Sequence, residues 1–345
     1  MTADALPGGV FVGAATARPR GVRRLLALRR LESPAKTAFV LAGGGSRGAA
    51  QVGMLGALVA RGIRPDAVYG TSVGAVNAAG FVGDPTPAGV ERMATIWRGL
   101  TSDDVFPHGR VPAPWRFLQQ RESVHPNDGL RKIVETGALI DRFEDSPVPL
   151  EVVATSLADG RAKWFSSGPL AEAVLASAAL PSLLPPVRID GGVYIDGGVV
   201  DNVPIGRAIQ HGSNRIFVLM CGPLHYMPSP PKRPVEAVLT AFFIAVHTRF
   251  ARERDSLPPG VEVVVFCVGS EPISRYDDFS ATETLMAAGR SNADEVLDFW
   301  EAGGIGEIGV GMGPKRAVPP QIPAPRTPVK PGRQADQVRV PAPPA

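Results

Sequence analysis

The chain has 345 residues, 44% of them hydrophobic, 6% aromatic and 20% charged, with a formal net charge of +3. This length is long for one domain and short for two ordinary ones, and the hydrophobic fraction is enough for a sizeable core. No run reaches the roughly 18 apolar residues that a membrane-spanning helix needs, so we expect none.

Charge is segregated along the chain. Residues 1–36 carry seven Lys and Arg against two acids, residues 313–345 carry six against one, and the stretch between them carries 23 against 30. Basic ends suit contact with an anionic membrane, although solvated, flexible ends are the more common case. An acidic centre with few aromatics argues against a nucleic-acid reader.

Both ends differ in composition from the centre. Residues 1–36 are predicted to be a basic mobile arm, in which GVRRLLALRRL could form a short amphipathic helix. The arm does not read as a secretion signal, because its arginines follow the weakly apolar start, so we expect a cytoplasmic protein, at most peripheral to a membrane. The tail, 313–345, is proline-rich and predicted to be disordered.

Strand and helix signals alternate between the ends. In chain order, TAFVLA, DAVYGTS, LEVVATSL, RIFVLM and VEVVVFCV predict strands, and helical patterns lie between and after them. This alternation predicts an α/β domain over 37–312, with a mainly parallel sheet covered on both faces. Residues 100–128, rich in proline and aromatics, break the rhythm as an insertion or lid would. AVLTAFFIAV, at 237–246, predicts a buried or partly amphipathic helix.

The first motif is a glycine loop, with Gly43, Gly45 and Gly48 as GxGxxG between a strand and a helix. A dinucleotide site would need an acid at the end of the second strand, but Asp66 begins that strand. No Gly-Lys-Ser/Thr follows, which excludes a Walker loop. The loop can still direct backbone N–H groups at an anion, either a phosphate or the oxyanion of an ester.

The second motif is G-x-S-x-G, with Ser72 between a predicted strand and a helix. The flanking Gly70 and Gly74 leave room for the sharp turn that exposes a nucleophilic hydroxyl. Because two neighbouring parallel strands end at the same edge of a sheet, we expect Ser72 to lie beside the glycine loop.

A nucleophilic serine needs a base. Only His211, His225 and His247 follow an acid such as Asp196 in the Ser-acid-His order, and none has the context of a catalytic loop. A carboxylate can instead take the proton directly in a two-residue dyad with Ser72. The other two histidines, His108 and His125, lie in the predicted lid.

Two Asp-Gly-Gly sites could supply that carboxylate. Asp190 lies between two short apolar runs, a pattern typical of a β-hairpin turn. Asp196 ends the second run, where it can point into a site from the end of a strand. This contrast favours Asp196 as the base and Asp190 as a turn residue.

Together these motifs resemble the patatin-like phospholipases. GGGSRG, GTSVGA and the second DGG occur in the family's order, ASAALPSLLPPV is similar to its proline-containing approach to the aspartate, and the resemblance covers about residues 37–300. It implies a lipid acyl hydrolase with a three-layer α/β/α fold, Ser72 as nucleophile and Asp196 as general base. It also implies an oxyanion hole in the glycine loop, chiefly from the N–H groups near Gly44, Gly45 and Ser46.

The resemblance has one departure, because Ala42 stands where many members have Asp. Arg47 matches the family's usual basic residue, which would meet a phosphate or brace the loop. The predicted oxyanion loop thus comprises Gly43, Gly44, Gly45, Ser46, Arg47 and Gly48, and the DGG motif adds Gly197 and Gly198.

The sequence thus predicts hydrolysis of fatty-acyl esters of lipids, with no metal or cofactor. A catalytically silent lipid-binding or regulatory protein on the same fold is the alternative, and a nucleotide-binding enzyme is a third. The two cysteines, Cys221 and Cys267, follow apolar runs and are expected to be buried as small hydrophobes, as in a reducing compartment. The sequence gives no sign of the oligomeric state.

Overall fold

The structure is a computed structural model that describes residues 9–14, 35–107, 123, 125–224, 230–231, 234–269 and 278–309. Its centre is a ten-stranded sheet with the strand order β10-β1-β9-β8-β2-β3-β4-β7-β6, in which β5 also pairs with β4. The five strands from β9 to β4 are parallel to one another, and the strands that flank them pair antiparallel. The predicted mainly parallel sheet is confirmed.

The parallel strands match the apolar runs that predicted them. They are β2 (Thr37–Leu41), β3 (Ala67–Thr71), β4 (Leu150–Ser156), β8 (Arg215–Leu219) and β9 (Glu262–Phe266). The flanking strands are β1 (Gly9–Ala14), β5 (Ala162–Phe165), β6 (Val187–Ile189), β7 (Gly192–Asp196) and β10 (Gly306–Gly309).

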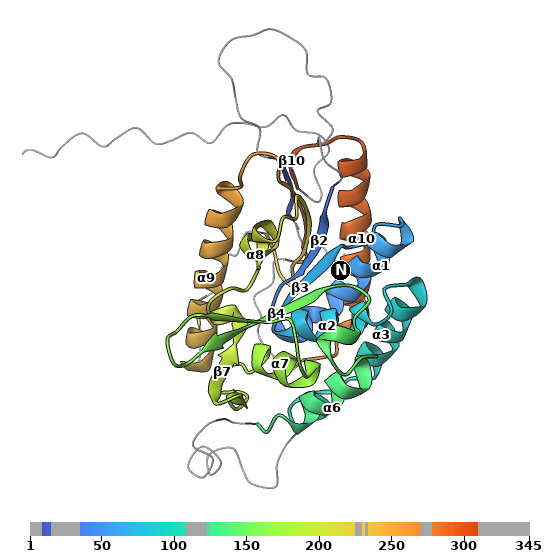
Figure 1. The fold of residues 1–345 in the computed structure, drawn as a ribbon. Helices are drawn as coiled ribbons and strands as arrows, with labels where there is room; N and C mark the ends of the chain where they lie inside the picture. Colours follow the sequence, from blue (N-terminus) through green and yellow to red (C-terminus); the bar gives the residue numbers. More distant parts are fainter. Residues whose placement is uncertain are drawn as a thin grey trace, which may run out of the picture. The chain divides into compact units, whose positions relative to one another are not determined.

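Helices cover both faces of the sheet, which gives three α/β/α layers (Figure 1). On one side of the sheet lie α1 (Ala49–Ala60), α2 (Val73–Val82), α3 (Pro87–Gly99), α4 (Ser102–Val105), α6 (Asp128–Gly137), α7 (Leu170–Ser177) and α10 (Thr282–Glu301). On the other side lie α8 (Ile205–Gln210) and α9 (Pro234–Asp255). Three short 3-10 helices are η1 (Gly45–Gly48), η2 (Phe143–Asp145) and η3 (Gly197–Val199).

Alternation along the central strands divides the core into two clusters. Phe39 and Leu41 of β2 pack in the larger cluster with α1 and α10, whereas Ala38 and Val40 pack on the opposite face, in the cluster that contains Phe250 of α9. Each β2 residue is therefore buried, as expected of a central parallel strand that reads as a continuous apolar run.

The register of the central strands places the functional loops. Leu41 of β2 lies opposite both Gly70 of β3 and Leu219 of β8, so the three strands end together. The glycine loop follows β2, and Ser72 follows β3. The two predicted motifs consequently lie side by side at the carboxyl edge of the sheet, where open α/β folds bind their ligands.

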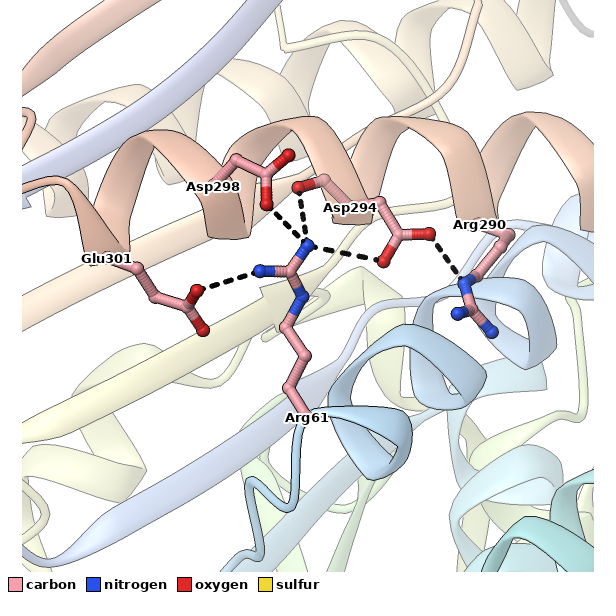
Figure 2. Close-up of polar contacts among 5 residues, drawn as sticks. All are labelled: Arg61, Arg290, Asp294, Asp298 and Glu301. Atoms are coloured by element: carbon pink, nitrogen blue, oxygen red, sulfur yellow. Dashed lines mark hydrogen bonds and ion pairs between the residues drawn. The ribbon is translucent and has the colours of Figure 1, made fainter.

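At the other end of α1, a cluster of ion pairs connects this helix to α10. The Arg61 guanidinium lies 2.7 Å from Asp298, 2.8 Å from Glu301 and 3.5 Å from Asp294 (Figure 2). Arg290, one turn before Asp294 on α10, pairs with the same carboxylate at 2.7 Å. These charges are partly exposed, and they fix the end of α1 that is far from the glycine loop.

One prediction about the ends of the domain needs correction. Gly9–Ala14 form β1, paired with β9 and β10, although they belong to the segment predicted to be a mobile arm. The reason is that β9 and β10 present open strand edges to this short apolar segment. The predicted amphipathic helix at 21–31, the proline-rich tail and most of the predicted lid lie outside the described residues. None of the helices described is long and apolar enough to cross a membrane.

Candidate active site

Ser72 occupies a sharp turn between β3 and α2. Its backbone has a positive φ, a conformation that L-residues rarely adopt. Such a conformation costs about 1–3 kcal/mol. Two contacts hold the turn: the Ser72 N–H donates to Ser177 Oγ at 3.0 Å, and Thr71 Oγ1 donates to the Asp201 carbonyl at 3.0 Å. The turn exposes the Ser72 hydroxyl at the N-terminus of α2, whose dipole favours negative charge there.

The glycines on either side of Ser72 allow a close approach of α2 to the sheet. A Cβ on Gly74 would lie 2.1 Å from the Leu41 carbonyl oxygen, and one on Gly70 would lie 2.7 Å from the Ala75 Cα. Any side chain at Gly74 would thus push α2, and the turn that carries Ser72, away from the end of β2.

Asp196 is the last residue of β7, and its carboxylate accepts a hydrogen bond from Ser72. The Ser72 hydroxyl donates to Asp196 Oδ2 at 2.6 Å, and the Gly198 N–H donates to Oδ1 at 2.7 Å. Asp196 is 1% exposed, and this burial raises its pKa from 3.8 to about 6, while the two hydrogen bonds act in the opposite direction. The backbone is also held, because Thr155 Oγ1 donates to the Asp196 carbonyl at 2.8 Å.

Asp190 forms the corner of the hairpin, as predicted. Strands β6 and β7 pair antiparallel with Ile189 opposite Gly192, which leaves Asp190 and Gly191 as a two-residue turn. Both residues have a positive φ. A type I′ turn requires this conformation at its two central positions. The two Asp-Gly-Gly sites therefore have separate structural roles.

The glycine loop presents only part of its length to Ser72. Gly44, Gly45 and Ser46 line one cavity with Ser72 and Asp196. The Gly43 N–H is directed instead at the Asn202 carbonyl, at 3.4 Å. Gly45 has a positive φ where the chain enters η1, and a glycine adopts this conformation without strain.

Arg47 and Gly48, the last two residues of the predicted oxyanion loop, contact other parts of the fold. Arg47 Nη2 donates to the Val268 carbonyl at 3.3 Å, a contact that braces the loop against the segment after β9. The Gly48 carbonyl accepts from Asn77 Nδ2 at 2.9 Å. Neither residue lines the cavity that contains Ser72.

An apolar cavity of about 130 Å³ leads away from the dyad. A mostly apolar wall with a few polar groups suits a ligand that is itself largely apolar. The glycine loop, the serine hydroxyl and the buried carboxylate thus line one cavity whose wall is mostly apolar. The side chains that form its wall come from α2, α3, α6, α9 and neighbouring loops, and include Val76, Trp97, Ile133, Leu184, Phe242 and Phe279.

The described histidines pack elsewhere. His211 Nδ1 lies 3.0 Å from Glu151 Oε1, and the buried His125 packs its ring 5.3 Å from that of Phe106. His247 lies on α9, in the wall of a smaller pocket behind the glycine loop. His108 and His225 fall outside the described residues.

Asp66 and the two cysteines, which the sequence also singled out, have structural roles. Asp66 precedes β3, and its carboxylate accepts the Thr37 N–H at 2.7 Å, at the edge of the sheet opposite Ser72. Both cysteines are free and buried, as predicted, and burial raises the pKa of each thiol to about 12. A thiol with so high a pKa is a poor nucleophile.

The sequence did not single out Ser177, Asn202, Gln51 or Asn77. Ser177 accepts the Ser72 N–H, and the Asn202 side chain donates to the Gly43 carbonyl at 3.4 Å. Asn202 stands four residues after Gly198, in the polar pair that ends GGVVDN, which was the one signal that could have identified it.

Relatives with known sequences match part of this chain. A protein described as an uncharacterized NTE family protein in Mycobacterium bovis is 33% identical over 181 residues, which are 52% of this chain and 47% of that protein. A lysophospholipase, NTE1, of Mycosarcoma maydis is 28% identical over 218 residues, 60% of this chain and 11% of that enzyme. The chain therefore spans half or less of the length of these relatives.

Solved structures give more distant matches. VipD from Legionella pneumophila is 16% identical with a TM-score of 0.39, covering 77% of this chain and 67% of that one. Human GIVD cytosolic phospholipase A2 is 13% identical with a TM-score of 0.38, covering 76% and 57%.

The family model described as patatin-like phospholipase matches residues 39–209. That range begins in β2, includes the glycine loop, the Ser72 turn and the second Asp-Gly-Gly, and ends in α8. The three motifs that the sequence placed in order are thus the ones that the fold gathers at one edge of its sheet. The chain therefore contains a patatin-like phospholipase domain over residues 39–209.

Proposed function

We propose that the protein hydrolyses fatty-acyl esters of lipids by two-step acyl transfer. The observation that carries the proposal is the 2.6 Å hydrogen bond from the Ser72 hydroxyl to Asp196, in the wall of an apolar cavity. The patatin-like phospholipase domain supports lipid as the substrate class. Some of the relatives are named lysophospholipases, which is consistent with an acyl ester of a phospholipid.

In the first step, Asp196 Oδ2 takes the proton of Ser72 as Oγ attacks the acyl carbonyl carbon. The carbonyl oxygen becomes an oxyanion, and we assign the N–H groups of Gly44, Gly45 and Ser46, which line the same cavity as Ser72, as its donors. Collapse of this intermediate breaks the bond to the alcohol, which leaves with the proton from Asp196, and the acyl group stays on Ser72.

In the second step, water replaces the alcohol. Asp196 takes a proton from this water, which attacks the acyl-Ser72 carbonyl, and the second oxyanion occupies the same donors. Its collapse releases the fatty acid and returns the proton to Ser72 Oγ. The acyl chain lies in the apolar cavity throughout, so burial of its methylene groups holds the ester against Ser72.

Fluorophosphonate labelling together with ester hydrolysis tests this proposal. We expect a fluorophosphonate to modify Ser72 and the protein to hydrolyse a chromogenic octanoyl ester, and Ser72→Ala to lose both properties. Ser177→Ala, which removes another serine hydroxyl beside the site, should remain labelled. A wild-type protein that neither reacts nor hydrolyses would be a silent lipid-binding protein and would refute the proposal.

A further inference from the structure

A chain of uncharged hydrogen bonds lies behind the glycine loop. Trp97 Nε1 donates to Asn77 Oδ1 at 2.9 Å, and Asn77 Nδ2 donates to Gln51 Oε1 at 2.8 Å and to the Gly48 carbonyl at 2.9 Å. Gln51 Nε2 donates to the carbonyls of Ala42 and Leu219 at 2.8 and 2.9 Å. Three helices, α1, α2 and α3, each contribute one side chain.

The hydrogen bonds of this chain all run in one direction, from the Trp97 donor toward the backbone carbonyls. The indole N–H can only donate, and the backbone carbonyls can only accept, so both amides are fixed in a single orientation. Every polar atom of the two amides has a partner, and the side chains are deeply buried, with Gln51 0%, Asn77 2% and Trp97 6% exposed. In such a dry environment, removing one donor leaves the next acceptor unsatisfied, and the loss passes along the chain.

Two members of the hydrogen-bond chain contact the two ends of the glycine loop, Gln51 at Ala42 and Asn77 at Gly48. The Ala42 carbonyl belongs to the peptide unit that enters Gly43, and Gly48 closes η1. Gln51 and Asn77 thus hold the two points between which Gly44, Gly45 and Ser46 are suspended. The positions of their N–H groups relative to Ser72 depend on these anchors.

The Trp97 end of the hydrogen-bond chain reaches the substrate cavity. The Trp97 ring forms part of the cavity wall and packs against Phe279, with the ring centroids 6.2 Å apart. An acyl group that fills the cavity therefore contacts the Trp97 ring, and the N–H of this ring is the first donor of the hydrogen-bond chain. An acetyl group, held at Ser72, is too short to extend along this wall.

We propose that Trp97, Asn77 and Gln51 are positioning residues that couple occupancy of the acyl cavity to the geometry of the oxyanion loop. The proposal rests on the proposed hydrolysis and adds a source of acyl-chain selectivity to it. A long acyl chain restricts the Trp97 ring, the ring fixes Asn77, and Asn77 fixes Gly48. Selectivity for long chains then arises in kcat as well as in KM, because the loop acts on the transition state.

The test compares acetyl and octanoyl chromogenic esters in the full chain and in Trp97→Phe, which keeps an aromatic ring and removes its N–H. Loss of one oxyanion donor costs about 100- to 1,000-fold, and a displaced loop should cost less. We expect kcat on the octanoyl ester to fall about 10- to 100-fold with KM changed by less than about threefold, and kcat on the acetyl ester to fall by about threefold or less.

Ile133→Ala is the matched control, because Ile133 lies in the cavity wall on α6 and takes no part in the hydrogen-bond chain. We expect this variant to raise KM for the octanoyl ester and to leave the ratio of the octanoyl to the acetyl kcat near that of the wild type. The pH profile of Trp97→Phe should also match the wild type, since none of the three residues contacts Asp196. An equal fall in kcat on both esters, or a change in KM alone, would overturn the coupling.

Gln51→Met separates positioning from loss of the fold. It keeps the length of a fully buried side chain that lies outside the cavity wall and removes the donors to Ala42 and Leu219. In folded protein, verified by circular dichroism, we expect kcat on the octanoyl ester to fall at least about tenfold at unchanged KM. An unchanged kcat refutes the positioning role. Absence of any Ser72-dependent hydrolysis in the wild type would instead refute both proposals.

Discussion

The two edges of the parallel sheet are stabilised by different kinds of polar contact. At the carboxyl edge the polar groups are buried, as Asp196 and Gln51 illustrate, and their partners are mostly hydroxyls, amides and backbone groups. At the amino edge the contacts include ion pairs between partly exposed side chains, such as Arg215 with Glu262 at 2.9 Å and the Arg61 cluster in Figure 2.

The two kinds of contact differ in how much they cost to desolvate. Water that surrounds the ion pairs keeps their desolvation cost small and their net contribution modest. At the carboxyl edge, burial raises the pKa of Asp196 and strengthens each hydrogen bond, but it also leaves a carboxyl group in an unfavourable environment. The strained Ser72 turn adds to this cost. The rest of the fold must therefore stabilise an edge that is costly by itself.

The largest expected effect contrasts the two Asp-Gly-Gly sites. Asp196→Asn removes the proton acceptor of Ser72, and general-base catalysis contributes about 100- to 10,000-fold, so kcat/KM on an octanoyl ester should fall within that range. Asp190→Asn should keep activity within about twofold, because asparagine also tolerates the positive φ of a type I′ turn. An active Asp196→Asn enzyme would remove the basis for the dyad.

The next effect is the dependence of activity on pH. Asp196 must be deprotonated to accept the Ser72 proton, and its pKa is raised to about 6. We expect kcat/KM to be constant above this pH and to fall about tenfold per unit below it. Asp201→Asn is the control, since burial also raises the pKa of Asp201, to about 7. If the fall in kcat/KM at low pH disappeared in Asp201→Asn, the titrating group would be Asp201 and not Asp196.

The same raised pKa predicts a change in stability of opposite sign to the change in activity. The folded wild type binds the Asp196 proton more tightly than the unfolded chain, so its free energy of unfolding falls as pH rises from about 4 to about 6. Asp196→Asn lacks this loss. Relative to the wild type it should gain about 2–3 kcal/mol between pH 4 and pH 8, measured by urea unfolding at each pH. A difference in unfolding free energy between the two proteins that stays constant from pH 4 to pH 8 would contradict the raised pKa of Asp196.

The hydrogen-bonded pair of Ser72 and Asp196 could be predicted because its signals are local. A strand, a serine between glycines and a helix lie within a few residues of one another around Ser72, and Asp196 ends a strand that a hairpin turn precedes. The fold class was predictable for the same reason, since each parallel strand is a continuous apolar run.

The supporting contacts could not be predicted, because they join residues that are far apart in the chain. Gln51, within AAQVGML, reads as an ordinary helix residue, and its contact with Leu219 spans 168 residues. Ser177 lies 105 residues from Ser72. The strand at Gly9–Ala14 was missed because basic residues follow this short apolar segment, and only the open edges of β9 and β10 give it a partner.

The smallest effect concerns the amino edge and the Arg61 cluster of Figure 2. Arg61→Met keeps most of the apolar stem and removes three ion pairs between α1 and α10, and exposed pairs contribute about 0.2–1 kcal/mol each. We expect a loss of about 1 kcal/mol at low salt that shrinks in 1 M NaCl, with kcat/KM unchanged, because these charges are screened and lie far from Ser72.

Arg290→Met provides the matched control for that prediction, since it removes an ion pair with Asp294 that lies within α10 alone. Its cost should be smaller, about 0.3–0.5 kcal/mol, the value typical of pairs four residues apart on one helix. If Arg61→Met lowered kcat/KM by a factor equivalent in free energy to its loss of stability, the amino edge would help to position the glycine loop through α1. The separation between a catalytic edge and a stabilising edge would then fail, because one helix would transmit the effect between them.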